Sequence, residues 1–177
     1  KRQIYITSST TGITDGSEII KDVSIEIGGQ EIDKHYGEWL DIWHELNLTG
    51  DQKGSYNAMV LNGSKNIEST KKLGDELTLY VPLAFWFNRK PGLALPLIAL
   101  QYHEVKVVIE IEAEANLGSN TAATIGTFKL WVDYIYLDTD ERRRFAQQSH
   151  EYLIEQLQMQ SFAIGKTAEL NFNHPVK

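Results

Sequence analysis

Cysteine is absent from the 177-residue sequence, so neither a disulfide framework nor a thiolate metal site can form, and stability must come from packing. Long apolar runs are absent too, since nothing approaches the roughly 18 residues that a membrane-spanning helix needs. Positive charge is scarce, because 17 Lys and Arg oppose 24 Asp and Glu for a net charge of −7. Surfaces that coat nucleic-acid phosphates cluster Lys and Arg. The sequence therefore predicts neither a transmembrane segment nor direct nucleic-acid binding.

The two ends lack the marks of a complete chain. There is no initiating Met, residues 1–4 show no secretion signal, and a new apolar pattern has just begun where the sequence stops. With 42% hydrophobic residues, the chain can bury one core, as one domain or as one domain plus part of another. We therefore expect a piece of a longer protein.

Apolar and polar residues alternate in short segments, which is typical of strands with one solvated face. In the clearest of them, Val105, Val107 and Ile109 alternate with polar neighbours. We predict strands near Ile4 and Ile6 and at residues 22–27, 77–83, 105–111, 128–134 and 153–159. About six strands without regularly alternating helices favour an antiparallel sheet over a βαβ fold.

Two segments have helical patterns instead. From Ile32 to Leu46 apolar residues recur every three or four positions, which predicts one amphipathic helix. Asp138 stands three residues before Glu141, a capping box that predicts a short helix over residues 141–148.

Between these elements lie polar stretches rich in small residues. Residues 47–74 and 113–126 predict surface loops, and a loop as long as the first is usually functional or flexible. At residues 161–170 a Gly-Lys-Thr sequence separates two alternating patterns. This interruption predicts an interdomain linker.

Motifs for enzyme chemistry are missing. The sequence has no phosphate-binding glycine loop, no G-x-S-x-G elbow and no H-E-x-x-H pair. His103–Glu104 and His150–Glu151 suggest metal or acid–base chemistry, but adjacent residues of a strand face opposite sides. The histidines as a whole show no ligand spacing: His35, His44, His103, His150 and His174. We predict no catalytic, cofactor-binding or metal-ligating residue, and no cofactor.

Three consecutive arginines could contact phosphate or an acidic partner: Arg142, Arg143 and Arg144. Asp138, Asp140 and Glu141 neutralise this run locally, which favours ion pairs within the chain or between subunits.

Two further patterns, a pair of tryptophans and two N-glycosylation matches, do not indicate a functional site. Trp39 and Trp43 share a helical face, and such an aromatic stripe is more often core than pocket. Asn47 and Asn62 match the N-glycosylation pattern, which is short enough that we attribute both matches to chance.

The run from Glu76 to Ile111 carries the most distinctive pattern, and at its centre Val81 to Val105 reads VPLAFWFNRKPGLALPLIALQYHEV. This segment closely resembles the major capsid proteins of nucleocytoplasmic large DNA viruses, which infect algae, amoebae, fish and insects. The resemblance extends to residues 25–30, 32–39, 133–138, 141–146, 150–154 and 173–177. It covers nearly the whole chain outside the two predicted loops.

The resemblance implies two successive jelly rolls, each a pair of packed antiparallel sheets. Residues 1–160 are then expected to form an all-β first jelly roll that lacks its opening strands, with short helical insertions, and residues 161–177 the linker and start of the second. The implied function is that of a homotrimeric, pseudo-hexagonal capsomer of an icosahedral shell, located in the virion and assembled in the host cytoplasm. The implied partners are neighbouring capsomers and minor capsid proteins.

Two other functions fit a jelly roll, because fold does not fix function. A carbohydrate-binding module would need aromatic and carboxylate side chains converging on an exposed face. A cupin-like metal enzyme would need several histidines and a carboxylate around one ion, which the scattered histidines make improbable.

Overall fold

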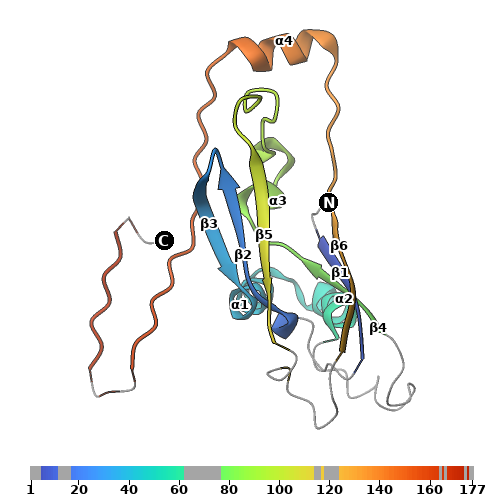
Figure 1. The fold of residues 1–177 in the computed structure, drawn as a ribbon, viewed down its shortest axis with the longest axis vertical. Helices are drawn as coiled ribbons and strands as arrows, with labels where there is room; N and C mark the ends of the chain where they lie inside the picture. Colours follow the sequence, from blue (N-terminus) through green and yellow to red (C-terminus); the bar gives the residue numbers. More distant parts are fainter. Residues whose placement is uncertain are drawn as a thin grey trace.

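The computed structural model describes residues 5–11, 17–61, 77–113, 117, 124–163, 165, 167–173 and 175. In this part the chain forms two antiparallel sheets of three strands each, ordered β4-β1-β6 and β3-β2-β5 (Figure 1). The strands are β1 (Tyr5–Thr11), β2 (Ile20–Ile27), β3 (Gln30–Tyr36), β4 (Leu77–Pro82), β5 (Val105–Ile111) and β6 (Thr124–Trp131). The helices are η1 (Ser17–Ile19), α1 (Gly37–Asn47), α2 (Gly50–Val60), α3 (Trp86–Arg89), η2 (Pro91–Leu93) and α4 (Thr139–Gln147).

One hydrophobic core joins both sheets. Ile6 of β1 and Val81 of β4 belong to the same buried cluster as Val23 and Ile25 of β2. The two long helices beneath the sheets and the segment after β4 complete this cluster: Leu40, Tyr56, Val60, Leu83, Ala84, Phe85, Trp86 and Phe87. Because apolar burial is the main favourable term in folding, this shared cluster holds the sheets and helices together.

The segment after β4 turns a sharp corner filled with aromatic rings. Phe85 is fully buried, stacks on Phe87 with ring centroids 5.4 Å apart and meets Trp86 edge-on at 6.4 Å. Pro91 then begins η2, and Pro96 lies beyond it. Proline inside a helix removes a backbone donor, so the chain bends repeatedly here before it enters β5.

The predicted helix from Ile32 to Leu46 is wrong in its first part, since residues up to Tyr36 form β3 and α1 begins only at Gly37. Gly28 and Gly29 have φ angles of 62° and 80°, a region that favours glycine, and they connect β2 to β3 as a hairpin. β3 buries Asp33 and His35. Because its buried face is polar, a hydrophobic pattern does not reveal this strand.

The predicted loop over residues 47–74 contains a helix, α2. Its start is marked by Thr49 and Gln52, whose side-chain Oε1 accepts a hydrogen bond from the Thr49 N–H at 3.5 Å. Its buried residues, Tyr56 and Val60, are four positions apart. Two buried residues make no long apolar stripe, which is why the helical period is not visible in the sequence. The remainder of the predicted loop, from residue 62, lies outside the described residues.

Two strand predictions in the second half need correction. β6 begins at Thr124, inside the predicted loop over residues 113–126, and ends at Trp131 because its pairing with β1 ends where Trp131 meets Tyr5. Residues 153–159 form no strand. Leu153 is 91% exposed, whereas its neighbour Ile154 packs against the core. A strand needs a ladder of backbone hydrogen bonds, which the alternation of residue types does not guarantee.

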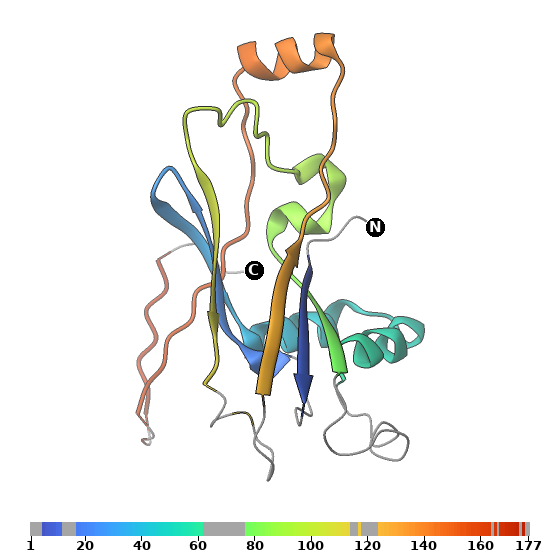
Figure 2. The same cartoon turned by 45° about the vertical axis from the view of Figure 1, so that its right-hand side comes forward.

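α4 stands apart from both sheets, between two extended segments (Figures 1 and 2). The predicted cap at its start is confirmed, because the Asp138 carboxylate accepts a hydrogen bond from the Glu141 N–H at 2.8 Å. None of the described helices is long and apolar enough to cross a bilayer.

We expect Phe85→Ala to lower the free energy of unfolding by about 3–5 kcal/mol, because truncating a buried phenylalanine loses transfer free energy and leaves a cavity. Urea denaturation followed by tryptophan fluorescence measures the loss. Phe162→Ala is the matched control, since Phe162 is 62% exposed and surface substitutions usually change stability by less than about 0.5 kcal/mol. Equal effects of the two substitutions would contradict the placement of Phe85.

Candidate functional site

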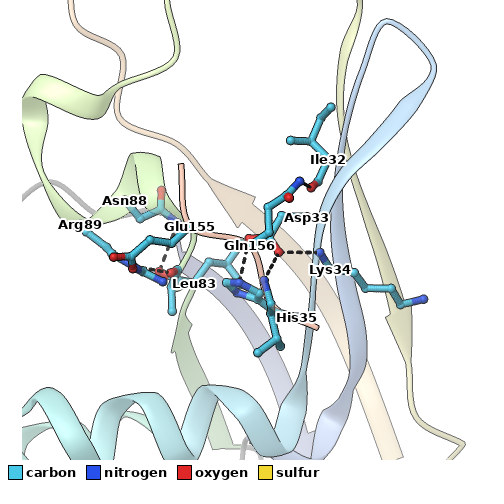
Figure 3. Close-up of polar contacts among 11 residues, drawn as sticks. Ile32, Asp33, Lys34, His35, Leu83, Asn88, Arg89, Glu155 and Gln156 are labelled. Carbon is cyan, nitrogen blue, oxygen red and sulfur yellow. Dashed lines mark hydrogen bonds and ion pairs between the residues drawn. The ribbon is translucent and has the colours of Figure 1, made fainter. Parts of the chain in front are cut away.

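Residues 154–157, which we call the strap, return from α4 and lie against β3 (Figure 3). The Leu157 N–H donates to Asp33 Oδ1 at 2.9 Å, and the Gln156 side chain donates to the carbonyl of Ile32. Ile154 packs on the core cluster. The strap is therefore held to β3 by side chains instead of a backbone ladder.

Asp33 and His35 lie buried on the same face of β3, with 4% and 1% exposure. Asp33 Oδ2 is 3.0 Å from His35 Nε2, close enough for an ion pair but without hydrogen-bond alignment. The other Asp33 oxygen accepts the N–H groups of Lys34 and Leu157. The His35 ring stacks on Phe85 with centroids 4.3 Å apart. Since a buried carboxylate is costly unless it is bonded, Asp33 gives the strap a defined attachment point above the aromatic corner.

Arg89 connects the strap to the corner and to α1. Its Nε donates to the Ala84 carbonyl at 3.1 Å, and its guanidinium pairs with Glu155 of the strap (Figure 3). The guanidinium carbon also lies 3.9 Å from the centre of the Trp43 ring, a cation–π arrangement. Only 19% of the Arg89 side chain is exposed, so solvent screens this ion pair less than it screens the surface pairs.

The residues that hold the strap were not predicted from the sequence. The spacing of Asp33 and His35 after the Gly28–Gly29 turn could have predicted that they lie on one face of a strand, since residues two apart in a strand share a face. No sequence pattern could have predicted the pairing of Arg89 with Glu155, because these residues are 66 positions apart in the chain.

The described histidines do not gather. His35 and His44 are buried in different places, and His103 is exposed. His150 is half-buried, and its Nε2 lies 2.8 Å from the Phe145 carbonyl. The fifth, His174, lies outside the described residues. Across the described part, no three His, Asp or Glu side chains are placed to share a metal ion.

The arginine run, the tryptophan stripe and the two asparagines that the sequence analysis considered are placed as follows. In α4, Arg143 lies 3.7 Å from Asp140, an exposed pair within the helix. Trp43 packs against the core cluster, as expected. The Asn47 side chain donates to the Trp43 carbonyl at 2.7 Å. Asn62 lies outside the described residues.

The outward face of the β3-β2-β5 sheet carries ion pairs between strands. Lys21 on β2 pairs with Glu110 on β5, and this hydrogen bond raises the pKa of Lys21 and lowers the pKa of Glu110. Lys34 on β3 pairs with Asp22 on β2 at 3.0 Å, which raises the pKa of Lys34. Lys21 and Glu110 are about half exposed, whereas Asp22 is buried, so water reaches this face at the Lys21–Glu110 pair but not at Asp22.

Apolar side chains stay exposed along two stretches that follow the sheets. The first, which we call the aromatic ridge, leads from β6 toward α4 and consists of Trp131, Val132, Tyr134, Ile135 and Tyr136. The second runs beyond α4 and includes Leu153, Met159, Phe162, Leu170 and Phe172. Large exposed apolar side chains are the groups from which association sites are built, so these stretches are the candidate functional surface.

The outer strands β5 and β6 also leave the core partly open. Ile111 on β5 pairs with the buried Ile20, yet it is 40% exposed. Leu130 on β6 pairs with the buried Ile6, yet it is 38% exposed. Cross-strand partners share a face, so these two side chains point toward the core while water still reaches them.

The chain belongs to the family described as the major capsid protein N-terminus, whose model matches residues 2–138. Its relatives include the major capsid protein of Pyramimonas orientalis virus, 50% identical over 99% of this chain and 47% of the relative. Another is the major capsid protein of Paramecium bursaria Chlorella virus 1, 44% identical over 90% of this chain and 39% of the relative. The chain thus spans less than half the length of these relatives.

Solved structures identify the fold. A quasi-atomic model of the PBCV-1 virus capsid matches with a TM-score of 0.74 and 40% identity, over 89% of this chain and 40% of that one. A crystal structure of PBCV-1 VP54, fitted into a reconstruction of the virophage Sputnik, gives the same TM-score at 39% identity and the same coverage of both chains. The two sheets described above are therefore a partial jelly roll, and the predicted fold class is confirmed.

Asp33→Ala is expected to release the strap, because it removes the buried acceptor of the Leu157 N–H; loss of such a partner costs about 1–3 kcal/mol. Hydrogen–deuterium exchange should show a loss of protection at Leu157 that exceeds the loss in β2. Asp33→Asn is the matched control, since it keeps an oxygen acceptor and should retain most of the protection. Unchanged exchange at Leu157 in the alanine variant would refute the attachment.

Proposed function

We propose that this chain is part of a structural, non-enzymatic subunit that self-assembles into an icosahedral virus shell. The observation that carries the proposal is the aromatic ridge, in a fold shared with virus capsid proteins at 40% identity. A shell subunit needs a rigid body together with apolar surface reserved for its neighbours. The cluster shared by the two sheets supplies the first, and the ridge supplies the second.

The assembly we propose is a homotrimer with a pseudo-hexagonal outline that contacts neighbouring capsomers and minor capsid proteins. Its location is the virion shell, after assembly in the host cytoplasm. The similarity to the PBCV-1 capsid supports an association with other capsid subunits. When one surface of a subunit binds a different surface of the next copy, the contact produces a ring such as a trimer if the rotation between copies closes.

We further propose that residues 1–160 form a first jelly roll and that residues 161–177 lead into a second. In the first, two further strands of the same protein would complete the sheets at the edges of β5 and β6. The partial exposure of Ile111 and Leu130 at these edges supports this arrangement, as does the greater length of the relatives. The attachment of the strap at Leu157 supports a boundary just beyond it.

The carbohydrate-binding alternative is not favoured, because the similar proteins reported above are capsid proteins.

Substitution of Tyr134 and Tyr136 by serine in the complete protein should weaken self-association without unfolding it, because both side chains are largely exposed. Truncation of a hot-spot aromatic at an interface costs about 2 kcal/mol or more, which corresponds to a loss of affinity of about thirtyfold or more. Analytical ultracentrifugation measures the association, and circular dichroism checks the fold.

Lys21→Ser is the matched control for this experiment, since Lys21 lies on the outward face that carries the ion pairs. It should leave association unchanged. A wild-type protein that stays monomeric under all conditions would refute the shell proposal, whereas a trimer indifferent to the tyrosine substitutions would refute only the role of the ridge.

A cryo-EM map of the assembled complete protein tests the missing strands. We expect one additional strand bonded to β5 and one to β6, both from the same chain, because an edge strand left unpaired beside an open core is prone to pair with other chains. Edges that remain bare, or that pair with a neighbouring copy, would contradict the proposal.

A further inference from the structure

α2 depends on few contacts for its helical structure. Its only buried residues are Tyr56 and Val60, and it contains Gly50 and Gly54. Glycine is among the poorest helix formers, and isolated helices this short are marginal in water. The helix also contacts β4, but its burial rests on these two side chains.

One of these two side chains rests on a histidine. The Tyr56 ring stacks on His44 of α1, with centroids 4.3 Å apart and planes inclined by 21°. His44 is 8% exposed, and its Nδ1 lies 2.6 Å from the Leu40 carbonyl. A neutral imidazole can donate its Nδ1 hydrogen to that carbonyl and stack on the phenol ring without placing a charge in the interface.

An open groove of about 370 Å³ reaches this stack from solvent, lined by residues of both helices. Its charged groups are already engaged: Glu45 of α1 pairs with Lys53 of α2, and Asp41 accepts from the Tyr56 hydroxyl at 3.4 Å. The other elements that contact α1 carry further ionisable groups: Glu18 on η1, Lys21, Asp22 and Glu26 on β2, and Glu31, Asp33, Lys34 and His35 on β3. Lys21 pairs with Glu110, Lys34 with Asp22, and Asp33 with His35.

We propose that His44 and Tyr56 form an acid-sensitive latch, in which protonation of the His44 imidazole loosens α2 from α1. The geometry makes the event local, because the stack lies at the junction of the two helices and water reaches it through the groove. An imidazolium in this position is buried against an aromatic ring while the nearby carboxylates keep their own partners. Acidification therefore weakens α2 before it disturbs the sheets.

The direction of the pH effect follows from burial, which lowers the pKa of His44, with the Leu40 hydrogen bond opposing that shift. Above the ordinary imidazole pKa of about 6.5 the side chain is neutral whether α2 is docked or open, and docking is strongest. As the pH falls below that value the open form binds a proton first. The ratio of docked to open α2 then falls by at most about tenfold per pH unit, until the pH passes the lowered pKa of His44 in the docked form.

Hydrogen–deuterium exchange on the complete protein, between pH 7.5 and pH 5.0 and corrected for intrinsic exchange rates, tests the latch. We expect protection of residues 50–60 to fall on acidification, by at most about tenfold per pH unit below a pH of about 6.5, while β2 stays protected. His44→Phe keeps a ring against Tyr56 and cannot titrate, so its α2 should remain equally protected at both pH values.

His103→Gln is the matched control, because His103 is an exposed histidine outside the two helices. This variant should lose α2 protection on acidification just as the wild type does. A wild-type α2 that keeps its protection at pH 5.0 would overturn the latch, as would a His44→Phe protein that loosens to the same extent. Neither outcome depends on whether the protein forms a shell.

Discussion

The stack of Phe85 on His35 is the contact on which the rest of the structure depends. Phe85 lies at the centre of the aromatic corner, where it is fully buried with Trp86 and Phe87 in the cluster shared by both sheets. His35 extends that cluster into β3 and meets Asp33, whose carboxylate accepts the Leu157 N–H. A single line of contacts thus leads from the corner to the strap. Because interiors are close-packed, displacing any member disturbs its neighbours.

This arrangement explains which parts of the fold could be predicted from sequence. The strands β2, β4 and β5 bury apolar residues on one face, and their alternation predicted them with nearly correct bounds. The Asp138 cap was predicted because local chemistry determines it. β3 was mistaken for helix because its buried side chains are Asp33 and His35, and hydrophobic periodicity cannot reveal a polar core face.

The candidate surface was harder to predict for a different reason. The alternation at residues 128–134 predicted a strand but not that the chain would leave the sheet after Trp131, which exposes Tyr134 and Tyr136. Where a strand ends depends on where its partner ends, and β1 is more than a hundred residues away. The bond between Gln156 and Ile32 spans 124 residues, so no local pattern contains it. The family resemblance supplied the function that these patterns could not.

The two kinds of attachment in this fold differ in how they respond to conditions. The sheets are joined by apolar burial, which does not titrate. α2 and the strap bury few side chains, and a few polar or aromatic contacts add to their attachment: Tyr56 on His44, Leu157 on Asp33, and Glu155 on Arg89. Elements with few buried contacts open first, while the core keeps its global stability. In a chain built in this way, α2 and the strap can detach from the core while the two sheets remain folded.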